Sequence, residues 1–447
     1  MIVEKIRCES MDLTGYGLCI HNGRSYQVPN FLPGELAKVE LLDYGRGKVI
    51  KFIETSKNRA KAPCPIYNEC GGCHLQHVSY LSQMDIKTNY VKNCFEKEQL
   101  STDSLLPCIG MKDPYHYRNK IQMVFSEKGK KVVAGFYEEN THRVINIDNC
   151  FIQDDIANNI IKTCKGLCVK HKIKPYLEDR GTGLVRHVLV KHSQTTNEVM
   201  VVIVTVSEIF PGRNNFVTEL RQIHPEITTI IQNVNSRKTS IVLGDFERIL
   251  YGSGTITDIL MGKKFLISSR SFYQVNSRQT ELLYKKAIEL AKPRKTDVVL
   301  DAYSGIGTIG IMFSDYVKKV ISVEINQVSV KNAIQNARVN KINNVRFYKD
   351  DAINFIQSVL ADKMAIDIVV VDPPRAGLDS KFIEALLKLE VKKIVYISCD
   401  PSTLARDIKI LTQKDYEIKR IQPVDMFAQT YHVETVVLLS LKLPSLS

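Results

Sequence analysis

The sequence predicts an α/β protein whose C-terminal part is a doubly wound parallel sheet. From about residue 291 onward, short apolar runs alternate with helical stretches such as residues 328–339. This alternation is typical of a parallel sheet with helices on both faces. Residues 416–424 and 433–441 have no helix between them, so they predict a terminal β-hairpin that adds an antiparallel strand. The expected parallel strands are residues 298–301, 320–324, 345–348, 366–372 and 394–398.

Composition indicates a soluble protein with a polyanionic partner. The 447 residues are 44% hydrophobic and 24% charged, and the net charge of +13 favours binding to nucleic acid. The N-terminus carries charges where a signal peptide needs an apolar core, and the apolar run 199–206 is too short to span a bilayer. We therefore expect a cytoplasmic protein without membrane contact, whose 11 cysteines are reduced.

Two further regions are expected before the parallel sheet. Residues 1–58 hold short strand-like pieces separated by Gly, Asn and Pro turns, which predict an OB-like β-barrel. These pieces resemble a TRAM domain, an RNA-binding module, although a passive barrel has the same pattern. Residues 59–290 predict a mixed α/β central domain, and residues 291–447 the catalytic domain. The basic residues that favour RNA contact at the end of the barrel are Lys48, Lys51, Lys57, Arg59 and Lys61.

A glycine-rich turn after the first parallel strand indicates a nucleotide-type cofactor. The segment 305–310 reads Gly-Ile-Gly-Thr-Ile-Gly, a pattern that also fits NAD. Glu324 ends the next strand, where a carboxylate can accept hydrogen bonds from ribose hydroxyls. Asp301, at the start of the loop, and the rigid Asp372-Pro-Pro-Arg turn favour S-adenosylmethionine over NAD.

Cys399 follows the strand 394–398 and is the candidate nucleophile. A thiol at the carboxyl end of a strand can face the ligand crevice of such a sheet, whereas the alternative is a small buried apolar residue. Asp400 and Pro401 are suited to the N-cap and N1 positions of a helix over residues 402–411. We expect the N-terminus of that helix to lower the pKa of Cys399.

A cysteine cluster near residue 70 predicts a metal centre. Cys64, Cys70 and Cys73 lie close together around a Gly-Gly turn, and Cys150 follows far downstream. Zinc sites more often show two C-x2-C pairs, whereas four thiolates also suit an iron–sulfur cluster. Spacing alone leaves zinc and iron open. Six other cysteines have no such spacing and are expected to pack in the core, namely Cys8, Cys19, Cys94, Cys108, Cys164 and Cys168.

Three motifs resemble those of the RNA uracil-C5 methyltransferase family. Phe272-Tyr-Gln-Val-Asn matches F-x-Q-x-N, Ser398-Cys-Asp-Pro matches S-C-[DN]-P, and His432-Val-Glu-Thr matches H-x-E-[ST]. With the TRAM-like pieces and the cysteine spacing, the chain resembles the iron–sulfur branch that acts on 23S ribosomal RNA. The resemblance covers residues 1 to about 440.

The resemblance implies a class I (Rossmann-like) S-adenosylmethionine-dependent methyltransferase domain and a role for each motif residue. It implies that Cys399 attacks C6 of a uracil and that Glu434 is the general base. The implied cofactor-binding residues are Gln274, Tyr303, Glu324 and Asp372. The implied ligands of a [4Fe–4S] cluster are Cys64, Cys70, Cys73 and Cys150. The partner is 23S ribosomal RNA, no protein partner is implied, and a monomer is expected.

Three other interpretations remain. A transfer-RNA uracil-C5 methyltransferase is disfavoured by residues 1–150, because that branch generally looks shorter and lacks the TRAM module and the cysteines. A non-catalytic RNA-binding protein is disfavoured because all the motif residues are intact. A dehydrogenase is weaker still, since nothing resembles a nicotinamide site.

Overall fold

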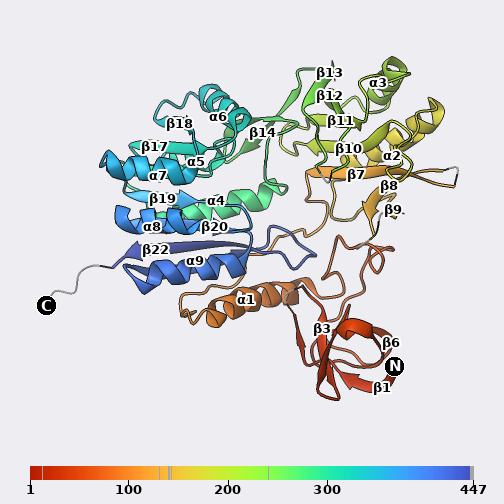
Figure 1. Cartoon of the computed structure of the whole chain (residues 1–447), viewed down its shortest axis with the longest axis horizontal. Helices are drawn as coiled ribbons and strands as arrows, with labels where there is room; N and C mark the ends of the chain where they lie inside the picture. Colours follow the sequence, from red (N-terminus) through yellow and green to blue (C-terminus); the bar gives the residue numbers. More distant parts are fainter. Residues whose placement is uncertain (13, 130, 139–140, 142, 240, 443–447) are drawn as a thin grey trace.

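The computed structural model describes residues 1–12, 14–129, 131–138, 141, 143–239 and 241–442. Its N-terminal part is a six-stranded sheet in the order β1-β5-β6-β4-β3-β2, and it forms a separate body at one corner of the molecule (Figure 1). Cys8, Cys19, Val28 and Val39 are buried in its core. The short strands are confirmed, whereas closure into an OB-like barrel stays a prediction. The strands are β1 (Ile2–Arg7), β2 (Ser10–Met11), β3 (Gly17–His21), β4 (Arg24–Val28), β5 (Leu36–Leu42) and β6 (Arg46–Glu54), with the 3-10 turn η1 (Asp43–Gly45) before β6.

The middle of the chain forms a seven-stranded sheet in the order β13-β12-β11-β10-β7-β8-β9. Helices α2 and α3 cover one face, where Ile121, Met123 and Phe125 alternate into the core. The predicted mixture of strands and helices in this region is confirmed. The elements are β7 (Lys120–Lys128), β8 (Lys131–Tyr137), β9 (Val144–Asn146), α2 (Asp155–Lys170), β10 (Val185–His192), β11 (Val199–Thr205), α3 (Arg213–Ile223), β12 (Ile227–Val234) and β13 (Phe246–Tyr251).

A hairpin and a helix join this sheet to the C-terminal one. Phe265 of the hairpin and Leu283 of α4 belong to one continuous core, which extends from Val202 of β11 to Val299 of β16. Helix α4 packs on β20 and β22. The two sheets are therefore fixed to each other through shared apolar packing. The joining elements are β14 (Thr255–Leu260), β15 (Lys263–Ser268) and α4 (Ser277–Ala291).

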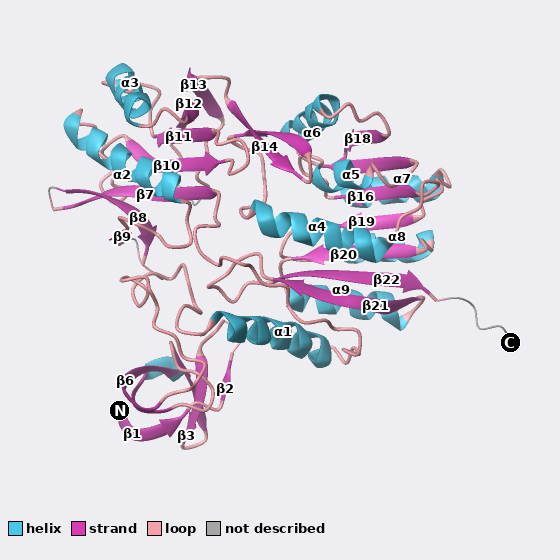
Figure 2. Ribbon diagram, turned by 180° about the vertical axis from the view of Figure 1, so that it is seen from behind, coloured by secondary structure: helices cyan, strands magenta, loops and turns pink. Residues whose placement is uncertain are grey.

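The C-terminal sheet has the order β18-β17-β16-β19-β20-β22-β21. Its strands are parallel except β22, which runs antiparallel between β20 and β21, so the predicted doubly wound sheet and terminal hairpin are confirmed (Figure 2). The elements are β16 (Val298–Ala302), α5 (Thr308–Phe313), β17 (Lys319–Glu324), α6 (Gln327–Val339), β18 (Val345–Lys349), α7 (Ala352–Ala361), β19 (Ile368–Val371), α8 (Ser380–Leu389), β20 (Lys393–Ser398), α9 (Pro401–Gln413), β21 (Tyr416–Val424) and β22 (Glu434–Leu441).

Alternating apolar residues explain why helices cover both faces of this sheet. Val299 lies in the core with α4, α5 and α6, whereas Leu300 lies in the core on the other face with α7, α8 and α9. Helix α1 (Tyr80–Lys97), which comes from the N-terminal part, joins this second layer through Val91 and Phe95. Its apolar face thereby attaches the segment that precedes it, including three of the clustered cysteines, to the C-terminal sheet.

The six cysteines that were expected to be packing residues are all buried, so that expectation is confirmed. No helix in the described part of the chain is long and apolar enough to cross a membrane. The domain limits at residues 58 and 290 remain predictions.

A buried ion pair attaches α1 to the loop that precedes β22. Lys87 and Asp425 are paired with both side chains fully buried, and the Tyr80 hydroxyl donates to Asp425 Oδ2 at 2.6 Å. Lys87 Nζ also donates to the Phe427 carbonyl at 3.1 Å. A buried charge that loses its partner is strongly destabilising, because neither water nor protein replaces the missing interaction.

We expect Lys87→Met to lower the free energy of unfolding by about 3–5 kcal/mol, since it leaves Asp425 buried without its cation. Urea denaturation measures the change. Lys92→Met is the matched control on the same helix, because its pair with Glu96 is about half exposed and should contribute under ~1 kcal/mol. Equal effects of the two substitutions would contradict the structural role of Lys87.

Candidate active site

Neighbouring strands of the C-terminal sheet end at the same level, which brings the predicted residues to one edge. Ala302 of β16 pairs with Val323 of β17 on one side and with Val371 of β19 on the other. Tyr303, Glu324 and Asp372 each follow directly after these positions. The chain order of the strands reverses between β16 and β19, and ligands of open α/β sheets bind at such a point.

Close packing explains the glycines of the first turn. Gly307 has φ 83°, and a Cβ there would lie 2.8 Å from the Phe347 ring. A Cβ at Gly310 would lie 2.4 Å from Ser322 Oγ. The backbone N–H of Gly305 donates to Glu324 Oε2 at 2.9 Å, so this loop is bound to the end of the next strand. The turn thus brings backbone close to the crevice, as the sequence predicted.

A narrow pocket lies in this crevice. It has a volume of about 40 Å³ and contains three of the four predicted cofactor residues, Gln274, Tyr303 and Asp372. Ligand pockets are usually several hundred Å³, so this pocket accounts for only a part of a cofactor site. Glu324 lies beside the pocket, where its other oxygen accepts from the Asn326 N–H at 2.7 Å.

Two features of the pocket indicate that it is built for a ligand. Tyr303 has φ 68°, a left-handed conformation that is rare for a bulky residue and concentrates at functional sites. Ser304 is buried, and its hydroxyl has no hydrogen-bond partner among the described residues. A buried polar atom of this kind is costly unless a ligand or water satisfies it.

The pocket also contains residues that the sequence did not single out as cofactor contacts. Ser304 and Thr308 belong to the glycine-rich turn, so their nearness to that motif was the available signal. Tyr284 comes from α4, and its hydroxyl lies 3.3 Å from Thr308 Oγ1. Nothing in the local sequence of α4 distinguishes Tyr284 from a core tyrosine.

The loop with Gln274 is held in place by the central sheet. The Asn119 side chain donates to the Gln274 carbonyl at 3.2 Å, and the backbone N–H of Asn119 donates to the Val275 carbonyl at 2.8 Å. Lys191 is buried and donates to the Ser268 and Ser271 carbonyls at 2.7 and 2.9 Å. The central sheet therefore positions a residue that lines the cofactor pocket.

Antiparallel pairing brings Cys399 and Glu434 together. Ser398 of β20 pairs with Thr435 of β22, so the next position on β20 is opposite the residue before Thr435. These two positions are Cys399 and Glu434. Glu434 is buried, and its Oε2 atom has no hydrogen-bond partner among the described residues. A thiol and a carboxyl group thus lie beside Asp372 at the end of the sheet.

Burial governs the protonation of Cys399, Glu434 and Asp372. It raises the pKa of Asp372 to about 7, and burial together with Asp372 raises the pKa of Glu434 to about 8. Burial, followed by the Glu434 charge, raises the pKa of Cys399 to about 11, while Arg375 acts in the opposite direction. At neutral pH the free protein therefore holds a thiol, and protons remain on the carboxyl pair.

The expectation that a helix would lower the pKa of Cys399 is wrong. Helix α9 does begin at Pro401, but the Asp400 carboxylate accepts from the backbone N–H groups of Ser402 and Thr403 at 2.9 and 3.3 Å. Asp400 thus satisfies the helix N-terminus with a negative charge, which itself raises the pKa of the thiol.

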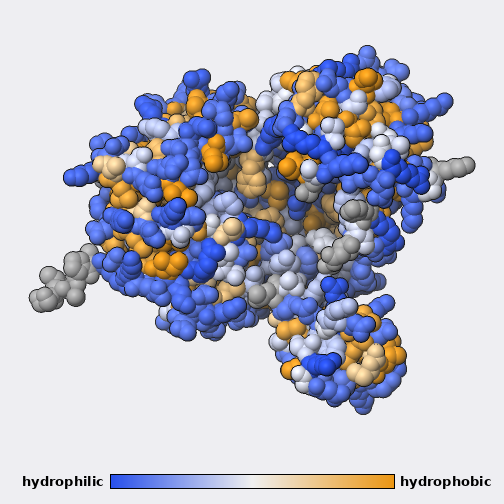
Figure 3. Space-filling view, in the orientation of Figure 1, coloured by the Kyte–Doolittle hydropathy of each residue, from blue (hydrophilic) through white to orange (hydrophobic). Residues whose placement is uncertain are grey.

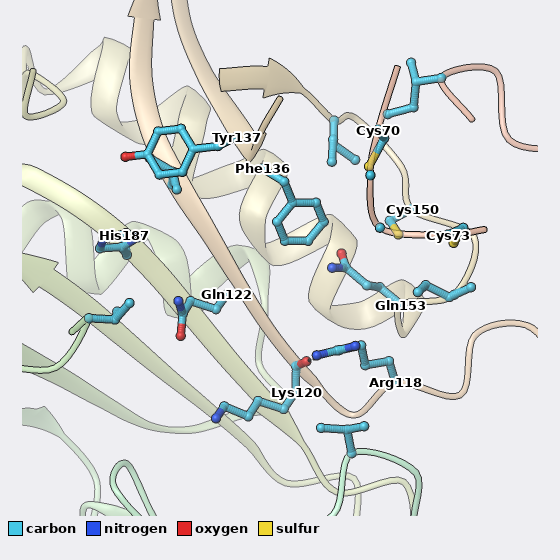
Figure 4. Close-up of a pocket in the computed structure, with 18 of the residues that line it drawn as sticks. Cys70, Cys73, Arg118, Lys120, Gln122, Phe136, Tyr137, Cys150, Gln153 and His187 are labelled. Carbon is cyan, nitrogen blue, oxygen red and sulfur yellow. Dashed lines mark hydrogen bonds between the residues drawn. The ribbon is translucent and has the colours of Figure 1, made fainter. Parts of the chain in front are cut away.

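The four clustered cysteines line one large cavity between the cysteine segment and the central sheet. Its volume is about 1320 Å³ (Figure 4). Burial raises the pKa of Cys73 to about 12, and the nearby thiols of Cys150, Cys70 and Cys64 add to the increase. The chain thus brings Cys150 to the three cysteines that precede it by about 80 residues in the sequence. Within the described residues, no three His, Cys, Asp or Glu side chains are arranged to hold a metal ion.

The order of the C-terminal sheet and the ligand crevice at its reversal define the class I fold of S-adenosylmethionine-dependent methyltransferases. The chain belongs to the tRNA (uracil-5-)-methyltransferase family, whose model matches residues 79–442. An uncharacterized RNA methyltransferase of Halalkalibacterium halodurans is 38% identical over 98% of this chain and 97% of its own. One from Bacillus cereus is 40% identical over 96% of this chain and 95% of its own.

A solved structure extends this similarity. The tRNA (uracil-54, C5)-methyltransferase of Pyrococcus abyssi, in complex with S-adenosyl-L-homocysteine, superposes with a TM-score of 0.78. It is 26% identical and covers 97% of this chain and 100% of its own. Since a tRNA enzyme matches nearly the whole chain, the length of residues 1–150 does not argue against a tRNA substrate. The expectation that a tRNA enzyme is shorter than this chain is wrong for this relative.

We expect Glu434→Gln to lower the pKa of Cys399, because it removes the carboxylate that raises it. Only the thiolate reacts with iodoacetamide, so alkylation of Cys399 at pH ~8 should become severalfold faster. Peptide mass spectrometry over a pH series measures this rate for Cys399 separately from the other cysteines. Glu417→Gln, at an exposed acid of β21, should leave the rate unchanged. A slower or unchanged rate in Glu434→Gln would contradict the proximity of the two groups.

Proposed function

We propose that the protein methylates C5 of a uridine, with S-adenosylmethionine as methyl donor and Cys399 as nucleophile. The observation that carries the proposal is the meeting of Cys399, Glu434 and Asp372 at the end of the sheet, next to the pocket formed by Gln274 and Tyr303. Gln274, Tyr303, Glu324 and Asp372 are the proposed contacts of the methyl donor. Ser304 and Thr308 extend this set, because both line the same pocket.

The proposed chemistry begins with a thiolate. Uracil C5 is a weak nucleophile, and addition of Cys399 Sγ to C6 converts the ring to an enolate whose C5 attacks the sulfonium methyl. The C–S bond of the donor breaks, and S-adenosylhomocysteine leaves with the electron pair. Glu434 then takes the proton from C5, and elimination of Cys399 restores the C5–C6 double bond. The ring returns to aromatic-like conjugation with a methyl group in place of the proton.

The raised pKa values are compatible with these roles. Glu434, whose pKa is about 8, is a stronger base than an exposed glutamate and is poised near neutral pH. Arg375 lowers the pKa of both Cys399 and Glu434, so it favours the thiolate and the ionised carboxylate when substrate binds. Activity should therefore rise with pH as the carboxyl pair loses its protons.

We propose 23S ribosomal RNA as the substrate, recognised in part by an OB-like, TRAM-type N-terminal barrel, and a cytoplasmic enzyme that acts as a monomer. The TRAM-like pieces and the four cysteines support this choice. Transfer RNA is the second candidate, because the Pyrococcus abyssi tRNA enzyme matches this chain along 97% of its length. The target base must leave its stack in either case, at a cost of a few kcal/mol.

Deletion of the gene should remove 5-methyluridine from one class of RNA, which mass-spectrometric mapping of ribosomal and transfer RNA identifies. Wild-type protein should restore the modification. Cys399→Ala should not restore it, although the purified variant should still bind S-adenosylmethionine, because the lost thiol lies outside the donor pocket. Cys168→Ala, at a buried cysteine of α2, is the matched control and should restore it. Methylation by Cys399→Ala would refute the nucleophile, and loss confined to tRNA would refute the 23S substrate.

We also propose that Cys64, Cys70, Cys73 and Cys150 hold a [4Fe–4S] cluster, for which their thiols would have to converge from the arrangement described above. Four thiols that line one cavity are the donor set of such a cluster, and its role would be structural because methyl transfer requires no electrons. Anaerobic purification should give a brown protein with about four irons and four sulfides per chain, and Cys73→Ser should lose both. A colourless protein with stoichiometric zinc would refute the cluster.

A further inference from the structure

The cavity beside the cysteines is bounded by one face of the central sheet, and the strand register shows which residues face it. Ile121, Met123 and Phe125 of β7 point into the core under α2. Lys120, Gln122 and Val124 alternate with them, so they point to the opposite face and line the cavity. His187 of β10 is the partner of Val124 and shares this face. Gln122 and His187 are thus diagonal neighbours, with side chains about 7–8 Å apart at their bases.

Two buried polar groups on the wall of this cavity have no partner in the described part of the chain. Gln153 is 1% exposed, and its Oε1 atom accepts no hydrogen bond. His187 is 7% exposed, and its Nδ1 atom is likewise unsatisfied. Burial lowers the pKa of His187 to about 4, so the ring is neutral and offers one donor and one acceptor. Unsatisfied buried groups beside a cavity of this size can be satisfied by water or by the polar groups of a ligand.

The surroundings of these groups match the parts of a nucleotide. Amide and neutral imidazole groups can pair with the edge of a base, whereas the charges of Arg118 and Lys120 suit a phosphate (Figure 4). Phe136 offers a ring on which a base can stack. Arg186 is already engaged, because it pairs with Glu178 at 2.5 Å and donates to the Arg237 carbonyl at 2.7 Å. The site therefore has neutral polar groups at its wall and the cations of Arg118 and Lys120 beside them.

The cavity adjoins the proposed cofactor pocket. Phe272 and Gln274 line both this cavity and the cofactor pocket, so one loop separates the two. Phe272 is 65% exposed, which leaves its ring available to a ligand. In the space-filling view the molecule is hollowed between the central and C-terminal sheets (Figure 3). An unpaired strand that delivers one base to Cys399 would place an adjoining nucleotide in this hollow.

We propose that the cavity binds a second, unmethylated nucleotide of the RNA, and that Gln122, Gln153 and His187 read the edge of its base. The proposal rests on the proposed function and extends it by a specificity-determining site. Single-stranded RNA is recognised by this combination of stacking and edge contacts, and the target uridine would then be selected through a neighbour as well as through its own ring.

The experiment uses the RNA fragment that contains the mapped uridine, with each flanking nucleotide replaced in turn by an abasic one. Affinity is measured with wild-type protein and with Gln122→Leu and His187→Leu. For the wild type, we expect one flanking position at which base removal weakens binding about tenfold or more. At that position alone, the variants should bind the intact and abasic RNAs equally well, because the contact is already lost.

Gln222→Leu, on the outer surface of α3, is the control and should keep the wild-type pattern. Binding of S-adenosylmethionine by the variants verifies their fold, and Gln122→Leu alone decides the test if His187→Leu is unstable. Two outcomes would overturn the proposal. In the first, the variants lose affinity at every abasic position as the wild type does. In the second, removal of a base changes the affinity of the wild type at no position. These outcomes differ from failure of the proposed function, in which the wild-type protein would form no 5-methyluridine in any RNA.

Discussion

The antiparallel insertion of β22 between β20 and β21 is the constraint on which the candidate active site depends. A purely parallel sheet would bring to this edge only residues that follow strands, such as Asp372 and Cys399. Because β22 runs the other way, its first residue, Glu434, reaches the same edge and faces Cys399. A shift of β22 by one residue would turn Glu434 to the other face of the sheet. The hairpin is thus a part of the catalytic arrangement as well as of the fold.

The loop before β22 must therefore be held as firmly as the strand. Asp425 is fixed by Lys87 of α1, and the Gln429 carbonyl accepts from the backbone N–H groups of His74 and Leu75 at 2.9 and 3.0 Å. His74 follows Cys73 directly, and its ring lies 4.6 Å from that of Tyr431. The cysteine segment and the start of β22 consequently form one packed unit, although about 360 residues separate them in the sequence.

The sequence predicted the parts of the site that depend on local pattern. The strands that end at Asp372 and Cys399 follow from apolar runs, and the turn at Gly305 follows from its glycines. Glu434 could be assigned only through resemblance, because a glutamate at the start of a strand has no distinctive local signal. Tyr284 and the sheet face with Gln122 and His187 escaped notice for a related reason. The function of these residues depends on which distant segment each one faces, and only the folded structure, through its strand register, shows that segment.

The sequence after Cys399 has two opposite effects on the pKa of its thiol. A helix begins after Cys399 as predicted, yet Asp400 caps it with a negative charge, and two buried carboxyl groups lie nearby. The free protein therefore keeps its nucleophile as a thiol, which limits oxidation and other unwanted reactions. The proposed reaction therefore requires that substrate binding lower the pKa of Cys399, in the direction in which Arg375 already acts. A site that stores protons in this way reacts chiefly with the ligand that completes it.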